Sequence, residues 1–103
     1  MYAKATQLQF QAGTTDEATR IIRDIMIPGA SKQRGFKGAF MLRHDTDPDK
    51  HIVISLWESK DDLLASRPPE DLIPLLAPLD DYIIESEQDT CDVLLAFYNN
   101  QER

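Results

Sequence analysis

The chain has 103 residues, enough for one domain, residues 1–103, in which a single sheet is covered by helices on one side. Its formal net charge of −7 and its scattered lysines and arginines exclude a nucleic-acid partner, because phosphate binding requires clustered positive charge. No apolar run approaches the roughly 20 residues of a membrane span, and the N-terminus lacks a signal-peptide pattern, so we expect a cytoplasmic protein with no membrane partner.

The first quarter of the chain predicts a strand followed by a helix. Polarity alternates along Tyr2–Phe10. One face carries Tyr2, Thr6, Leu8 and Phe10, and the other carries Ala3, Ala5, Gln7 and Gln9. Thr14 and Glu17 have the spacing of a capping box, which predicts a helix start at this point. The helix is predicted to kink or end at Pro28-Gly29, with a further turn reaching Gln33.

The middle of the chain predicts two antiparallel strands. Phe36–His44 and His51–Trp57 are joined by a polar turn, as in a hairpin. In the first of these strands, alternation places Phe36, Gly38, Phe40 and Leu42 on one face and Ala39 and Met41 on the other. In the second, Ile52, Ile54 and Leu56 share one face, and His51, Val53, Ser55 and Trp57 share the other.

The last part of the chain predicts a second helical region and a fourth strand. Ser59 and Asp62 cap a helix that starts at Lys60, and Arg67-Pro68-Pro69 interrupts it. A further helical piece runs from Glu70 to about Leu79. The apolar run Asp92–Tyr98 predicts the fourth strand. Residues 80–90 are ambiguous, and Ile83–Thr90 either extends this last strand or crosses to the other subunit.

The resulting order β-α-β-β-α-β predicts an α+β fold with a ferredoxin-like antiparallel sheet. Two helices cover only one face of such a sheet, yet three of the strands carry apolar residues on both faces. The uncovered face therefore predicts an interface, and a second copy of the chain in a symmetric homodimer is the simplest partner.

Several kinds of chemistry are disfavoured by the sequence. The hairpin turn between His44 and His51 imitates the opening of a calcium loop but has Lys50 and Leu56 where that loop needs Gly and Glu, so we expect no metal site. No serine or cysteine has an obvious base partner, and four scattered glycines form no phosphate loop. Cys91 is the only cysteine, which excludes an internal disulfide.

Trp57, the only tryptophan, has two interpretations. It ends a strand, on the same face as Val53 and Ser55. A large aromatic residue at this point is either an anchor of the core or one wall of an apolar pocket with a few polar groups.

Three segments of the chain resemble the antibiotic biosynthesis monooxygenase (ABM) family. They are Arg20-Ile-Ile-Arg-Asp24 followed by Pro28, then Gly35-Phe36-Lys37-Gly38, then Ile54-Ser-Leu-Trp-Glu-Ser59, and the resemblance extends over about residues 2–98. It implies a homodimeric α/β-barrel with a cavity between each sheet and its helices. Characterised members of this family oxidise electron-rich polycyclic phenols with O2 and no metal or flavin, others degrade haem, and many have no established activity. In several of them a Trp at the end of the third strand lines the cavity. Trp57 matches that position.

The chain departs from the haem-degrading relatives at two places. Those proteins carry a His ligand on the helix after this Trp, and Lys60–Ser66 contains none. They also carry an Asn on the first strand, where this chain has Thr6 and Gln7. Haem degradation is therefore disfavoured, and we expect no cofactor.

Two functions remain open at this stage. The first is a cofactor-independent monooxygenase that acts on an aromatic or quinol-type molecule, with no catalytic residue assigned. Its candidate substrate-binding residues are Trp57, Ser55, Arg43, Thr6, Gln7 and Tyr82. The second is a non-catalytic small-molecule-binding or interaction dimer, which the absence of an acid–base constellation favours.

Overall fold

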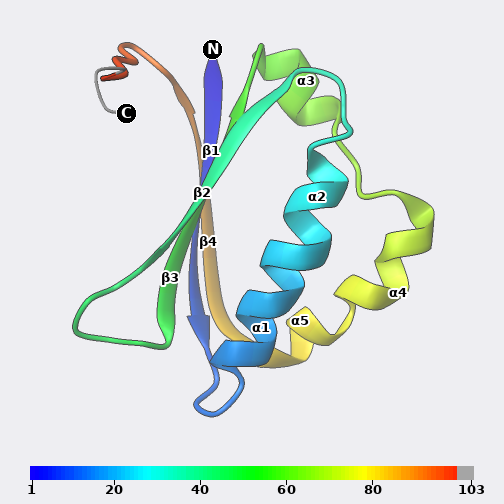
Figure 1. Ribbon diagram of the computed structural model, residues 1–103, viewed down its shortest axis with the longest axis vertical. Coiled ribbons are helices and arrows are strands. Elements are labelled where there is room, and N and C mark those ends of the chain that lie inside the picture. The colour runs from blue at the N-terminus through cyan, green and yellow to red at the C-terminus, as the bar shows by residue number, and fades with distance from the viewer. Residues whose placement is uncertain (100–103) are drawn as a thin grey trace.

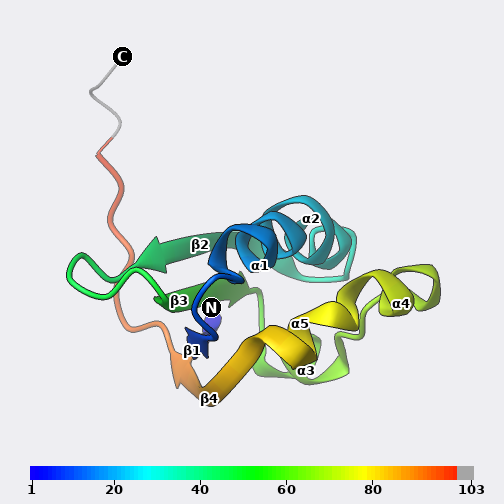
Figure 2. The same ribbon diagram turned by 90° about the horizontal axis from the view of Figure 1, so that it is seen from below.

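The computed structural model describes residues 1–99. Its four strands are β1 (Tyr2–Phe10), β2 (Phe36–Arg43), β3 (Lys50–Trp57) and β4 (Ile83–Asp92). They form one antiparallel sheet in the order β2-β3-β1-β4. All the helices lie on the same side of this sheet (Figures 1 and 2). The predicted α+β, ferredoxin-like fold is confirmed.

The first helical region is continuous in space but changes its winding. It consists of α1 (Thr15–Ile21), a π-helical turn at Ile22–Met26 and α2 (Ile27–Ala30). The helix therefore passes through Pro28 rather than ending there. Proline lacks an N–H and its ring crowds the carbonyl one turn earlier, so a wider turn before it relieves the conflict. In that turn the Ile27 N–H donates to the Ile22 carbonyl, five residues back.

The predicted capping box at the start of α1 is wrong. The Thr14 hydroxyl donates to the Gln11 carbonyl at 2.7 Å, and Glu17 pairs with Arg20, also at 2.7 Å. Both side chains are thus occupied elsewhere. The helix start is held instead by the Thr15 hydroxyl, which donates to an Asp49 carboxylate oxygen at 2.6 Å across to the β2–β3 hairpin.

The second helical region is a chain of short pieces. They are α3 (Lys60–Ala65), a 3₁₀ turn (Glu70–Leu72), α4 (Ile73–Leu76) and α5 (Pro78–Tyr82). The cap predicted for α3 is confirmed, because the Ser59 hydroxyl accepts from the Asp62 backbone N–H at 3.1 Å. Gly35 makes this junction possible: its φ of +82° suits glycine, and an added Cβ would overlap the Asp62 side chain.

The fourth strand lies earlier in the sequence than predicted. β4 occupies residues 83–92, pairing with all of β1, whereas residues 93–99 form no strand or helix. In that C-terminal segment Leu94 and Phe97 are 93% and 84% exposed. It leaves the end of β4 on the side away from the helices (Figure 1). The described part of the chain therefore leaves most of the large apolar side chains of this segment exposed.

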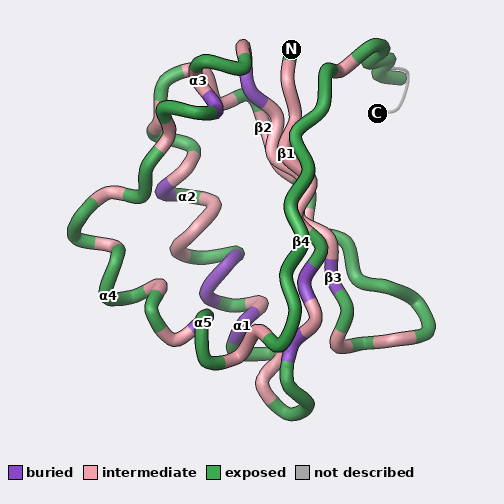
Figure 3. The backbone as a smooth tube through the Cα atoms, turned by 180° about the vertical axis from the view of Figure 1, so that it is seen from behind, coloured by how far each residue is buried: buried purple, intermediate pink, exposed green. Residues whose placement is uncertain are grey.

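The core lies between α1 and the end of the sheet near the β2–β3 turn. Its buried members are Leu8, Phe10, Ala18, Ile21, Ile22 and Leu79. Figure 3 shows buried positions on the first helical region and on the sheet, while β4 is exposed along nearly its whole length. Above this core, toward α3, the sheet and helices separate enough to leave a cavity.

A β-bulge changes which residues of β2 face the helices. Phe36 pairs with Trp57 and Gly38 with Leu56, so Lys37 is an extra residue in the ladder. Simple alternation placed Phe36 with Phe40 and was wrong at this point. Phe36 shares the helix side with Ala39 and Met41, and Phe40 and Leu42 lie on the open face.

Candidate functional site

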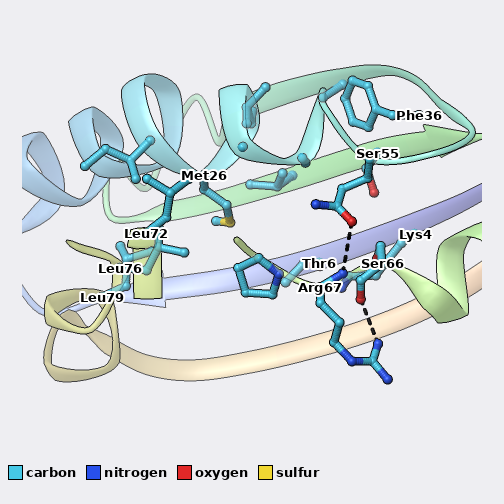
Figure 4. A pocket seen from close by; sticks show the side chains of 18 of the residues that line it. Lys4, Thr6, Met26, Phe36, Ser55, Ser66, Arg67, Leu72, Leu76 and Leu79 are labelled. Carbon is cyan, nitrogen blue, oxygen red and sulfur yellow. Dashed lines mark hydrogen bonds between the residues drawn. The ribbon is translucent and has the colours of Figure 1, made fainter. Parts of the chain in front are cut away.

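A cavity of about 420 Å³ lies between the sheet and the helical layer. Its floor is the helix-facing side of the four strands. One wall is the π-helical turn with α2, and the other is residues 66–76, which we call the outer segment. Leu72, Leu76, Leu79 and Met26 gather at one end, and Lys4, Ser55, Ser66 and Phe36 lie at the other (Figure 4).

Trp57 lines the floor of the cavity beside Ser55. It is 3% exposed, and its ring meets Phe36 edge to face with 5.3 Å between ring centroids. The indole N–H donates to the Ser55 hydroxyl at 3.0 Å. Trp57 is therefore buried like a core residue and also lines the cavity.

The helical wall owes its shape to the π-helical turn. Three consecutive residues, Ile25, Met26 and Ile27, line the cavity there. Gly29 then brings α2 against the outer segment, since an added Cβ would lie 2.7 Å from the Leu72 Cδ1 atom. The result is a long apolar wall opposite the strands.

The cavity has a polar end, formed by Lys4, Thr6, Ser55, Ser66 and Arg67. Lys4 is directly opposite Ser55 in the β1–β3 ladder, and both side chains point to the helix side. The Arg67 guanidinium is exposed at the mouth, where it donates to the Leu64 and Ser66 carbonyls at 3.0 and 2.7 Å. The Arg67 backbone N–H donates to the Gln33 side chain at 3.4 Å.

The structure brings together three of the six residues predicted to bind a ligand. Thr6, Ser55 and Trp57 line the cavity. Gln7 is on the opposite face of β1, beside Glu87 of β4. Arg43 is exposed and pairs with His51 near the hairpin, and Tyr82 packs against the core cluster. These three do not line the cavity.

Sequence reasoning missed Lys4. A charged residue at an inward position of an alternating strand was a usable signal, because Lys4 has the same parity as Thr6 and Leu8. Phe36 was also missed, since the bulge that turns it inward cannot be seen in the alternation.

His51 is the one buried polar residue among those described, and it lies outside the cavity, at the hairpin end of β3. Its ring is 5.2 Å from that of Phe10, and its Nδ1 atom has no partner within the described part of the chain. Burial and then the positive charge of Arg43 lower the pKa of His51 below its ordinary value of 6.5. Both effects favour the neutral form of the imidazole.

Two absences bear on the chemistry. Within residues 1–99 no three His, Cys, Asp or Glu side chains gather as a metal site would require. No helix in the same range is long and apolar enough to cross a membrane.

Comparison with the sequence models of protein families identifies one family. The sequence model of the antibiotic biosynthesis monooxygenase family matches residues 1–68. No curated protein sequence is similar enough to the chain to count as a relative.

Solved structures with the same fold cover nearly the whole chain. A provisional antibiotic biosynthesis monooxygenase from Nitrosomonas europaea has a TM-score of 0.80 at 14% identity, covering 92% of this chain and all of its own. A mutant of SnoaB, a cofactor-independent oxygenase from Streptomyces nogalater, has a TM-score of 0.77 at 16% identity, covering 95% and 97%. A mutant of MhuD with two manganese protoporphyrin IX molecules per active site has a TM-score of 0.72 at 17% identity, covering 96% and 100%.

Proposed function

Because the chain belongs to the antibiotic biosynthesis monooxygenase family, we propose that it is a cofactor-independent monooxygenase acting on an aromatic, quinol-type small molecule with O2. One observation carries this proposal: an apolar cavity lined by Trp57 and Phe36 and, beside them, by hydroxyl and ammonium groups. Such a cavity suits a flat ring that bears an oxygen substituent.

The chain's residues would act by binding and by charge stabilisation. The ring stacks near Trp57 against the wall formed by Met26 and Ile27, and its oxygen lies at the polar end. For an anthrone-type substrate, loss of a proton gives an electron-rich anion that reduces O2. One oxygen atom becomes a new carbonyl on the ring carbon and the other leaves as water, so the substrate supplies all four electrons. The protein stabilises the anion and excludes bulk water.

A haem group does not fit these residues. The described residues that line the cavity include no His, Cys or Tyr, the side chains that usually hold haem iron at the proximal position. Helix α3, which follows Trp57, also carries no His. We therefore propose no haem and no other cofactor. The single exposed cysteine, Cys91, favours a reducing, cytoplasmic setting.

A homodimer is part of the proposal. The open face of the sheet carries Ile52, Ile54 and Leu56 from β3 beside Phe40 and Leu42 from β2. Phe40 and Leu42 are 52% and 46% exposed in the single chain. A second copy packed on this face removes the apolar surface from water. Sedimentation should give twice the 11.7 kDa chain mass at micromolar concentration.

A second candidate, a binding protein without catalysis, is favoured by one observation. Among the described residues lining the cavity, Asp80 is the one carboxylate, it follows Leu79 at the apolar end, and no imidazole accompanies it. The cavity thus offers no obvious general base near the polar end.

Oxygen uptake separates these two functions. Purified, metal-free protein is mixed with phenols, quinols and anthrone-type compounds, and O2 consumption is recorded for wild type, Trp57→Phe and the control Leu64→Ala, whose side chain is exposed on α3. Uptake above the uncatalysed rate that falls at least several-fold in Trp57→Phe alone supports the monooxygenase. Tight binding of these compounds without uptake supports the binding protein.

A further inference from the structure

The polar end of the cavity is made of hydrogen-bond donors. The Ser55 hydroxyl already accepts the indole N–H of Trp57, and within residues 1–99 it donates to no protein atom. Lys4, directly opposite in the ladder, brings an ammonium group with three donors and no acceptor. Cross-strand partners of this kind have Cβ atoms roughly 5 Å apart. One ligand oxygen can therefore accept from both side chains.

Within residues 1–99 no carboxylate forms an ion pair with Lys4. Its neighbours in the ladder are Ser55 and Thr90. Asp80, the carboxylate in the described cavity lining, directly follows Leu79, which lies at the apolar end (Figure 4). In a chain with a net charge of −7, a lysine facing an apolar cavity without a carboxylate partner is the complement of a negative ligand.

The aromatic wall beside Lys4 sets the shape of that ligand. Trp57 and Phe36 lie one inward step further along the sheet, and the helical wall stands opposite. A negative group held by Lys4 and Ser55 is thus flanked by surface suited to a ring rather than to a sugar or a phosphate.

We propose that the ligand of this cavity is an aromatic molecule bearing an oxyanion, bound by the Lys4 ammonium and the Ser55 hydroxyl. This inference rests on the proposed function and specifies its substrate class. An oxyanion has two sources, a carboxylate substituent and an ionised phenol, and both present the same negative oxygen to Lys4. In the oxidation proposed above, Lys4 would contact the substrate oxygen and favour its deprotonated form.

A matched pair of probes tests the charge. 2-Naphthoate and 2-naphthamide have nearly the same shape, but only the first is an anion. Binding of each is measured by calorimetry for wild type, Lys4→Met, Lys4→Arg and Lys32→Met, the last being an exposed lysine outside the cavity. We expect wild type to prefer naphthoate by about tenfold or more, the gain typical of one charge-assisted hydrogen bond. The preference should vanish in Lys4→Met and persist in Lys4→Arg and Lys32→Met.

The phenol source is tested by absorbance titration of 2-naphthol. The pKa of bound naphthol should fall on wild type and on Lys32→Met, and should not fall on Lys4→Met. Equal binding of naphthoate and naphthamide to wild type, with no change in the pKa of naphthol, overturns the role of Lys4 and leaves the cavity's proposed function intact. Failure of all three probes to bind to wild type overturns the proposed aromatic-binding function itself.

Discussion

The two faces of the sheet differ in polarity and in whether other elements cover them. The face covered by helices contains Lys4, Thr6 and Ser55 among its apolar residues and encloses a cavity. The open face is almost continuously apolar over β2 and β3, yet nothing within the described chain covers it. The face that the helices cover is therefore not the more apolar face. The polar groups are kept where a ligand would need them, and the apolar groups where a second copy would bury them.

The same substitution on the two faces should give different results. Phe10 is 1% exposed against α1, and Phe40 is 52% exposed on the open face. Phe10→Ala should lower the free energy of unfolding by about 3–5 kcal/mol, because it leaves a cavity in the core. Phe40→Ala should show a loss that depends on protein concentration, since it would act through the proposed dimer. Urea unfolding at two protein concentrations measures both, and equal, concentration-independent losses would contradict the distinction.

A charge on the open face should break the dimer and spare the fold. Phe40→Arg would bury an unpaired cation between two copies, which should weaken association by about a hundredfold. Analytical ultracentrifugation measures the dissociation constant, and circular dichroism checks the helices and strands. Lys37→Arg, on an exposed residue paired with Glu58, is the control. A variant as dimeric as the wild type would show that this face is not the interface.

Removing one hydroxyl on the covered face should disturb Trp57. In Ser55→Ala the indole N–H loses its acceptor, which should cost about 1–2 kcal/mol if no water replaces the hydroxyl. The emission maximum of Trp57 should shift at the same time. Thr90→Ala, on the neighbouring edge strand, keeps the indole bond and should leave the emission unchanged. An unaltered spectrum in Ser55→Ala would mean that this bond is not formed in solution.

The smallest effect should be a pH dependence that comes from His51 on the covered face. Because the folded protein holds the pKa of His51 below 6.5, the unfolded chain binds more protons just below that pH. The stability contributed by neutral His51 is complete above pH 6.5 and is lost as the pH falls through the folded pKa. Arg43 adds to this loss, and Asp47 and Asp49 oppose it. Thermal melts of wild type and His51→Gln between pH 7.5 and roughly 5 should diverge, and parallel curves would refute the assignment.

The alternation of polar and apolar residues was sufficient to predict most of the sheet, because in β1 and β3 every second side chain points to the same face without a bulge. It failed at Phe36, where Lys37 is one residue too many in the ladder. It failed again at the end of the chain, since β4 carries Glu85, Glu87 and Asp89, whereas residues 93–98 have the stronger apolar pattern. Charges suit an edge strand, and the choice between the two segments is made by pairing with β1 rather than by local preference.

The site was predictable only where a residue's face was predictable. Ser55 and Trp57 reached the cavity because β3 is regular, and Thr6 did so for the same reason on β1. Gln7 was selected with Thr6 although consecutive strand residues point to opposite faces. The outer segment could not be placed at all, because its contact with α2 depends on the missing side chain of Gly29.

The length of the π-helical turn at Ile22–Met26 determines which side chains of this helical region line the cavity. A turn closed by a bond to the fifth residue back holds one residue more than a turn of α-helix. Losing one residue there would close the turn to an α-helix and change which of residues 25–27 face the cavity, while the strands kept their register. It would also return Pro28 to the crowding that the wider turn relieves. A change in this one turn can therefore alter the lining of the cavity without altering the sheet.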